Sequence, residues 1–241
     1  MRHVEAGGLV FGAGKMKICV PVCEKTCAAA VAAVLEICKT PADLIEWRID
    51  YMEEDILAAA HAVLEAAGGR PVLCTFRTKG EGGEREIDSE AYFALNESLG
   101  ALGVPMLDLE LMRCLAHQSR AKRAIDALHE KGVVIVLSNH DFEKTPPRAE
   151  LLERYRQMEA LGGDLPKIAV MPQNQRDVMV LLSAMTEASA AYGPLIGISM
   201  GELGKVTRVR GGAFGSVMTF ASKGKASAPG QIDAEALASM L

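Results

Sequence analysis

The sequence lacks the features that would place it in or across a membrane. No apolar stretch among its 241 residues is long enough to span a bilayer. Residues 1–17, MRHVEAGGLVFGAGKMK, also lack the long apolar core of a signal peptide. We therefore expect a cytoplasmic protein that has no membrane partner.

The excess of basic residues that is typical of nucleic-acid-binding proteins is missing as well. Lys and Arg number 26 against 31 Asp and Glu, which gives a net charge of -5. This balance argues against a nucleic-acid partner. A small anionic substrate remains compatible with it, because local basic residues decide such binding.

The six cysteines do not form the framework of a disulfide-rich secreted protein, and in a reducing compartment we expect free thiols. Cys19, Cys23 and Cys27 have the spacing C-x3-C-x3-C, which differs by one residue from the cluster signature of radical enzymes. This segment passes from a predicted strand into a predicted helix, so the three thiols need not converge. We expect no metal site there. Metal-ligand spacing is also missing for His61, His117 and His129, which should lie at the surface.

Short apolar segments alternate with longer helical patterns along almost the whole chain. The predicted strands are residues 16–22, 43–48, 71–77, 104–109, 133–138, 165–170, 194–198 and 217–220. Several are apolar throughout, which is typical of parallel strands covered on both faces. No glycine fingerprint of a nucleotide-binding open sheet follows the first strand. The eight repeats favour a closed (β/α)8 TIM barrel over an open doubly wound sheet, with residues 1–241 as one catalytic domain.

Capping and turn residues mark the ends of the predicted elements. Thr26 can cap the helix that follows it, and Thr145-Pro146 offers a second N-cap with proline at the first helical position. Gly162-Gly163 stands where a helix C-cap belongs. Gly7-Gly8 predicts a short strand pair that closes the bottom of the barrel.

Ionisable residues recur at alternate positions of the predicted strands, near their carboxyl ends. Residues of one such parity share one face of the sheet. In a TIM barrel the carboxyl ends of the strands are where the inward-facing side chains build the active site. Burying such groups costs several kcal/mol each unless they pair or bind a ligand. The pattern predicts a polar pocket, although each residue alone could simply reach solvent. The residues are Glu46, Arg48, Arg77, Asp108, Glu110, His140 and Lys167.

Lys167 and His140 each allow a structural and a catalytic interpretation. Lys167 follows Pro166 at the start of a strand, so it is either a solvated lysine at the bottom of the barrel or an inward nucleophile for a substrate carbonyl. His140 is either a structural hydrogen-bonding residue or a general acid and base.

Seven motifs, in order along nearly the whole chain, resemble the type I 3-dehydroquinate dehydratases. They are EWRID (46–50), TFRTKGEGGE (75–84), DLEL (108–111), SNHDF (138–142), PKIAVMP (166–172), GSVMTF (215–220) and SAPGQ (227–231). The resemblance implies a lyase that needs no metal or cofactor. It would convert 3-dehydroquinate to 3-dehydroshikimate, in the shikimate pathway or in quinate use, and would act as a homodimer.

The resemblance also implies roles for particular residues. Lys167 would form an imine with the substrate ketone, and His140 would take a proton and return it to the departing hydroxyl. Glu81 would pair with the histidine, and Arg208 would bind the substrate carboxylate. Residues 227–231 would form a lid that excludes water. The remaining substrate-binding residues would be Glu46, Arg48, Arg77, Met200, Phe220, Ser227, Ala228 and Gln231.

Some features depart from this pattern or allow another function. Ile198 stands where the family often has Met, and Asn139 stands where Tyr is common. Because Asn139 has outward parity, we expect no role for it. Residues 210–215, RGGAFG, could cradle a phosphate but more simply make a turn into the last strand. The alternatives are a lysine-dependent aldolase, which usually has a phosphate site, and a non-catalytic metabolite-binding barrel.

Overall fold

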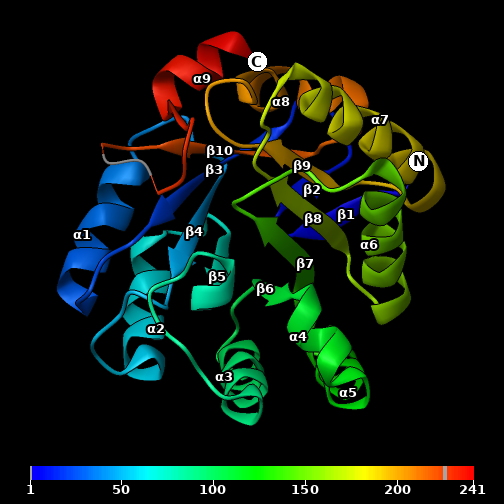
Figure 1. The fold of residues 1–241 in the computed structure, drawn as a ribbon. Helices are drawn as coiled ribbons and strands as arrows, with labels where there is room; N and C mark the ends of the chain where they lie inside the picture. Colours follow the sequence, from blue (N-terminus) through cyan, green and yellow to red (C-terminus); the bar gives the residue numbers. More distant parts are fainter. Residues whose placement is uncertain (1, 225–226) are drawn as a thin grey trace.

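The computed structural model describes residues 2–224 and 227–241 (Figure 1). In these ranges, parallel strands form one curled sheet in the order β11-β10-β3-β4-β5-β6-β7-β8-β9. They are β3 (Lys17–Val22), β4 (Leu44–Arg48), β5 (Val72–Thr75), β6 (Met106–Glu110), β7 (Val134–Asp141), β8 (Leu165–Val170), β9 (Ile196–Ser199), β10 (Met218–Ser222) and β11 (Ile232–Asp233). A parallel bridge between Leu195 and Ser216 joins the approaches to β9 and β10 and closes the barrel.

Helices surround the barrel on its outside, as Figure 1 shows. They are α1 (Cys27–Ile37), α2 (Ile56–Ala66), α3 (Ser89–Ala101), α4 (Leu111–Ala116), α5 (Gln118–His129), α6 (Arg148–Leu161), α7 (Gln175–Tyr192), α8 (Lys205–Arg210) and α9 (Ala234–Met240). Two 3-10 turns, η1 (Lys79–Glu81) and η2 (Gly211–Phe214), complete the connections. Strands β3 to β10 each overlap one predicted strand, so the prediction of a (β/α)8 barrel is confirmed.

The N-terminal strand pair is also confirmed. Strands β1 (Val4–Ala6) and β2 (Leu9–Phe11) pair antiparallel through a turn in which Gly7 and Gly8 have φ of 52° and 82°. Glycine tolerates this left-handed conformation because it has no Cβ. Val4, Ala6 and Phe11 pack against the side chains that fill the barrel, so the pair covers its lower end.

Of the predicted caps at Thr26, Thr145-Pro146 and Gly162, the first and the last are confirmed and the second is wrong. The Thr26 hydroxyl accepts a hydrogen bond from Ala29 N, and Gly162 ends α6 with φ of 96°. The Thr145-Pro146 N-cap was wrong, because α6 begins at Arg148 after Pro147. A proline disfavours helical geometry in the residue before it, so Pro147 keeps Pro146 out of the helix.

The barrel interior is apolar toward the amino ends of the strands, its lower end, and charged toward their carboxyl ends, its upper end. The lower level consists of Leu44, Leu73, Met106, Val136 and Leu165. Two positions further along the same strands, the same face presents Glu46, Thr75, Asp108, Ser138 and Lys167. A third level adds Arg48, Arg77, Glu110, His140 and Ala169. The predicted parity therefore holds, and the polar levels lie toward the carboxyl ends of the strands.

Among the described helices, none combines the length and the apolar character needed to cross a membrane. The outer core, between the sheet and the helices, is apolar and includes Trp47 and Tyr155. This packing leaves the upper part of the barrel interior as the place where charged side chains are buried together.

Candidate active site

Lys167 points into the barrel from β8 and is only 4% exposed. Its Nζ lies 3.3 Å from Asp108 Oδ2 and 3.9 Å from Glu46 Oε1. The same nitrogen lies 4.5 Å from the centre of the Phe220 ring, a cation–π contact. The alternative of a solvated lysine at the bottom of the barrel is therefore wrong.

Arg77 balances the buried carboxylates beside Lys167. Its Nη2 lies 2.7 Å from Asp108 Oδ1, and its Nη1 lies 3.1 Å from Glu110 Oε1. The Ser138 hydroxyl donates to Asp108 Oδ1 at 2.6 Å. Burial alone would raise the pKa of Asp108, but Arg77 and Lys167 outweigh it and hold this pKa below its usual value. Asp108 is therefore ionised at neutral pH and bridges the two cations.

Asp50 orients Arg48, which ends β4, the strand next to β5 in the barrel. Arg48 donates from Nε and Nη2 to the two Asp50 carboxylate oxygens, both at 2.8 Å, in a bidentate pair. Asp50 also accepts hydrogen bonds from the backbone N of Arg77 and of Glu84. It therefore fixes both the Arg48 side chain and the start of the loop after β5. We had not assigned Asp50 a role, although it continues the parity of Glu46 and Arg48.

His140 and Glu81 form a buried hydrogen-bonded pair. His140 Nδ1 lies 2.9 Å from Glu81 Oε2, and the His140 backbone N donates to the same oxygen at 2.9 Å. Burial lowers the pKa of His140 well below its usual value, and the charges of Arg77, Lys167 and Arg48 lower it further. The imidazole is therefore neutral at neutral pH. When Glu81 is ionised it can only accept hydrogen bonds, so Nδ1 then carries the proton and Nε2 is left as a free base.

A turn rich in glycine places Glu81 beside His140. Glu81 ends η1, and Gly82 follows with φ of 86°. A Cβ on Gly83 would lie 1.8 Å from Arg77 O, so this close approach requires glycine. Burial raises the pKa of Glu81 to about 7, although Arg77 Nη1 at 3.8 Å opposes the shift. Glu81 thus titrates near neutrality.

Arg208 is a buried cation that has no carboxylate partner within residues 2–224 and 227–241. It is 1% exposed on α8, and its two Nη atoms donate to the carbonyl oxygens of Phe220 and Pro229 at 3.2 Å and 2.9 Å. Its Nε is buried and has no hydrogen-bond partner in the described chain. Burial lowers the pKa of Arg208 to about 10. A buried, incompletely paired guanidinium suits the carboxylate of a ligand.

Residues 227–231 fold over the same region. Ser227 N donates to Gln231 Oε1 at 2.8 Å, and Gln231 Nε2 donates back to Ser227 Oγ at 3.0 Å. Gly201 N donates to Pro229 O at 3.2 Å. Gly230, with φ of 76°, lies so close to Gly201 that a Cβ would come within 2.4 Å of Gly201 O. This segment is therefore attached to the top of the barrel.

All twelve predicted site residues line one small cavity of about 70 Å³. Its other walls are Gly82, Phe142, Ala169 and Ile198. Phe142, which we had not assigned a role, stacks on His140 with ring centres 6.5 Å apart. The cavity is smaller than most ligand sites, which measure roughly 300–1,000 Å³.

Asn139, for which the sequence predicts no role, contacts this site from outside the cavity. Asn139 has the predicted outward parity, but its Nδ2 donates to Glu81 Oε1 at 3.2 Å. The outward parity is thus confirmed, and Asn139 nevertheless contacts a predicted site residue. The signal available in the sequence was its position directly before His140. Its partner is on the loop after another strand, and strand parity does not predict such a contact.

Features outside this cavity fit the simpler interpretations. Cys19 is buried, while Cys23 and Cys27 are partly buried, and all three are free thiols. Across residues 2–224 and 227–241, no group of three or more His, Cys, Asp or Glu side chains could hold a metal ion. The histidines expected at the surface are exposed, and His129 lies 2.9 Å from Asp164 there.

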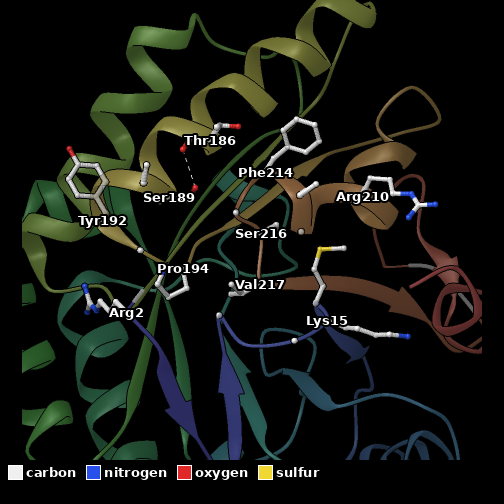
Figure 2. Close-up of a pocket in the computed structure, with 18 of the residues that line it drawn as sticks. Arg2, Lys15, Thr186, Ser189, Tyr192, Pro194, Arg210, Phe214, Ser216 and Val217 are labelled. Atoms are coloured by element: carbon white, nitrogen blue, oxygen red, sulfur yellow. Dashed lines mark hydrogen bonds between the residues drawn. The ribbon is translucent and has the colours of Figure 1, made fainter.

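A larger cavity of about 950 Å³ lies at the other end of the barrel and contains none of the predicted site residues. Figure 2 shows it between the end of α7, the η2 turn and the segment that leads into β3. Residues 211–214 form η2, which enters β10 at its amino end. Phosphate sites of TIM barrels lie at the carboxyl ends of the strands. The RGGAFG segment is therefore the turn that we expected.

The barrel holds a buried lysine and a neutral histidine at the carboxyl ends of its parallel strands. This arrangement is typical of barrel enzymes that attack a substrate carbonyl with an amine. Residues 18–241 match the type I 3-dehydroquinase family, and the chain belongs to that family.

Relatives and solved structures agree with this assignment. The 3-dehydroquinate dehydratase of Syntrophotalea carbinolica is 43% identical over 100% of this chain and 97% of its own. The type I 3-dehydroquinate dehydratase of Clostridium difficile, crystallised with covalently modified comenic acid, superposes with a TM-score of 0.94 at 37% identity. That match covers 99% of this chain and 96% of the other. The 3-dehydroquinate dehydratase of Geobacillus kaustophilus superposes with a TM-score of 0.94 at 34% identity. That match covers 100% of this chain and 95% of the other.

We predict that the substitution Asp108→Ala destabilises the fold by about 3–5 kcal/mol, because it leaves Arg77 and Lys167 buried without their shared partner. The free energy of unfolding in urea measures this effect. The control is Glu90→Ala, which removes a carboxylate that is 76% exposed and pairs with Arg120. Its cost should stay within about 1 kcal/mol. Equal losses in the two variants would contradict the role of Asp108.

Proposed function

We propose that the chain catalyses the dehydration of 3-dehydroquinate to 3-dehydroshikimate in the shikimate pathway, with Lys167 as the imine-forming amine. The observation that carries this proposal is the position of Lys167 Nζ in the cavity that His140 and Arg208 also line. Membership of the type I family supports the reaction.

In the first step, the Lys167 ammonium passes one proton to His140 Nε2 and attacks the substrate ketone as the free amine. The ketone oxygen takes back that proton and a second one from the nitrogen, and it leaves as water. The product is a protonated imine, which carries its positive charge close to where the ammonium was. Asp108 and Glu46, at 3.3 Å and 3.9 Å from Nζ, stabilise that charge. The imine draws electrons from the neighbouring carbon and makes its proton easier to remove.

His140 carries out the proton transfers that follow. Its free Nε2 takes the proton from the carbon next to the imine and leaves an enamine. The enamine electrons expel the hydroxyl on the following carbon, which departs as water with the proton that His140 returns. Glu81 holds the imidazole in the required tautomer and stabilises its transient charge. A water then hydrolyses the imine and restores the Lys167 amine.

The remaining residues bind the substrate. Arg208 binds its carboxylate, while segment 227–231 closes over the ring and excludes water. Arg48, Arg77 and Glu46 hold the ring hydroxyls and polarise the cavity. The walls and the lid are Met200, Phe220, Ser227, Ala228 and Gln231.

The family resemblance further supports a cytoplasmic homodimer whose residues 1–241 form one catalytic domain. It also supports a reaction that needs no metal or other cofactor, since the Lys167 imine supplies the electron sink. The net charge of -5 argues against a nucleic-acid partner.

Borohydride trapping tests the imine directly. With 3-dehydroquinate present, reduction should inactivate the protein and leave a ligand adduct on the peptide that contains Lys167, as read by mass spectrometry. Lys167→Ala should give no adduct and no turnover. Lys205→Ala, which removes an exposed lysine paired with Glu202, should behave as wild type. An adduct on another lysine, or none at all, would refute the proposed role of Lys167.

We predict that His140→Ala separates imine formation from elimination. The variant keeps Lys167 and its carboxylate neighbours, so borohydride should still trap the adduct. Loss of general acid–base catalysis should lower kcat by about 10²–10⁴-fold, measured as absorbance of the conjugated product. A variant that turns over at the wild-type rate would show that another group moves the proton.

The pH dependence should follow Glu81. The pKa of this carboxyl is about 7, so it becomes protonated as the pH falls through that value. A protonated carboxyl holds the Nδ1 proton of His140 less well, and kcat should decrease below about pH 7. His140 itself, whose pKa lies well below its usual value, stays neutral in this range. A kcat that stays constant down to about pH 5 would contradict the role of Glu81.

A further inference from the structure

We propose that Asn139 and Arg154 are positioning residues that hold the Glu81 carboxylate in the orientation that His140 requires. Asn139 lies on β7 and is 4% exposed, with its side chain directed away from the barrel interior. Arg154 lies on α6, the helix that follows β7. The inference rests on the proposed function, because it assigns a task to the residues behind the proposed proton carrier.

The three side chains form a chain of hydrogen bonds from α6 to the active site. Arg154 Nη1 donates to Asn139 Oδ1, and Asn139 Nδ2 donates to Glu81 Oε1 at 3.2 Å. The other oxygen, Glu81 Oε2, accepts from His140 N and faces His140 Nδ1. Both carboxylate oxygens are therefore held, one by Asn139 and one by His140.

The Asn139 amide has only one orientation that satisfies both neighbours. A guanidinium has donors and no acceptor, while a carboxylate has acceptors and no donor. Oδ1 must therefore face Arg154, and Nδ2 must face Glu81. Arg154 and Glu81 favour the same orientation, and Arg154 holds the amide so that its Nδ2 end reaches the active site.

The burial of Arg154 supports such a role. Its side chain is 12% exposed, whereas that of Arg156, two residues further along α6, is 57% exposed. Arg156 pairs with Glu153 at the surface, but Arg154 turns inward, and its buried Nε has no hydrogen-bond partner among the residues that the structure describes. Its Nη2 also donates to Glu150 on the same helix. Arg154 therefore bears a desolvation cost that a surface arginine avoids.

The charges around Glu81 make the donor from Asn139 important. Burial and the carboxylates of Glu110 and Asp108 favour the neutral acid, while Arg77 and the His140 backbone N favour the carboxylate. The effects that favour the neutral acid prevail, burial first, and raise the pKa of Glu81 to about 7. A hydrogen bond donated to the carboxylate favours the charged form. Without Asn139, Glu81 should be protonated at neutral pH.

The experiment compares Asn139→Leu, Arg154→Met and the control Arg156→Met. One readout is the pH dependence of kcat. The other is the ¹³C NMR titration of the Glu81 carboxyl, assigned with Glu81→Gln, which needs no turnover. Asn139→Leu should move both midpoints upward by about one pH unit, and Arg154→Met should move them in the same direction. KM should change little, since neither residue lines the cavity. Arg156→Met should match wild type.

Because Asn139→Leu leaves the Arg154 guanidinium without its acceptor, the double variant Asn139→Leu/Arg154→Met provides a second measurement in case the single variant does not fold. Unmoved midpoints in the folded variants, or a change in KM alone, would overturn the positioning role. If the wild-type protein does not dehydrate 3-dehydroquinate but the Glu81 titration still moves upward in the variants, only the proposed function is overturned.

Discussion

The need to neutralise charges inside the barrel governs this structure. Arg77 is 3% exposed and lies between Asp108 and Glu110, and Asp108 also contacts Lys167. None of these groups could be buried alone, because an unpaired charge costs several kcal/mol in such surroundings. Their pairing connects β5, β6 and β8 across the barrel interior. Apolar side chains fill the level below and leave this charged level at the carboxyl ends of the strands.

The same charges determine the chemistry that we propose. A protonated imine on Lys167 has the charge of the ammonium that it replaces, so the surrounding carboxylates serve both states. Burial and, after it, these positive charges lower the pKa of His140, so that it stays neutral and able to accept a proton. Glu81, with a pKa of about 7, then fixes the tautomer of the imidazole. Asn139 and Arg154 extend this control to the outer face of β7.

Much of the fold and the membership of the site follow from the sequence, for identifiable reasons. Alternation of side chains along a strand is a local property, so parity correctly placed Lys167 and His140 inside the barrel. Pairing across the barrel is not local. The sequence could not show that Asp108 joins Arg77 to Lys167, nor that Asn139 reaches Glu81 from the outward face. The predicted cap at Thr145-Pro146 was wrong because Pro147 moved the start of the helix.

The protonation state of His140 is the property on which the proposed chemistry depends most directly. It can be measured by ¹⁵N NMR on protein labelled at histidine, with the His140 signals assigned through His140→Ala. At about pH 8, where Glu81 is ionised, we expect a neutral ring with its proton on Nδ1 and a bare Nε2. A doubly protonated imidazolium, or a neutral ring with the proton on Nε2, would contradict the role of His140 as the base.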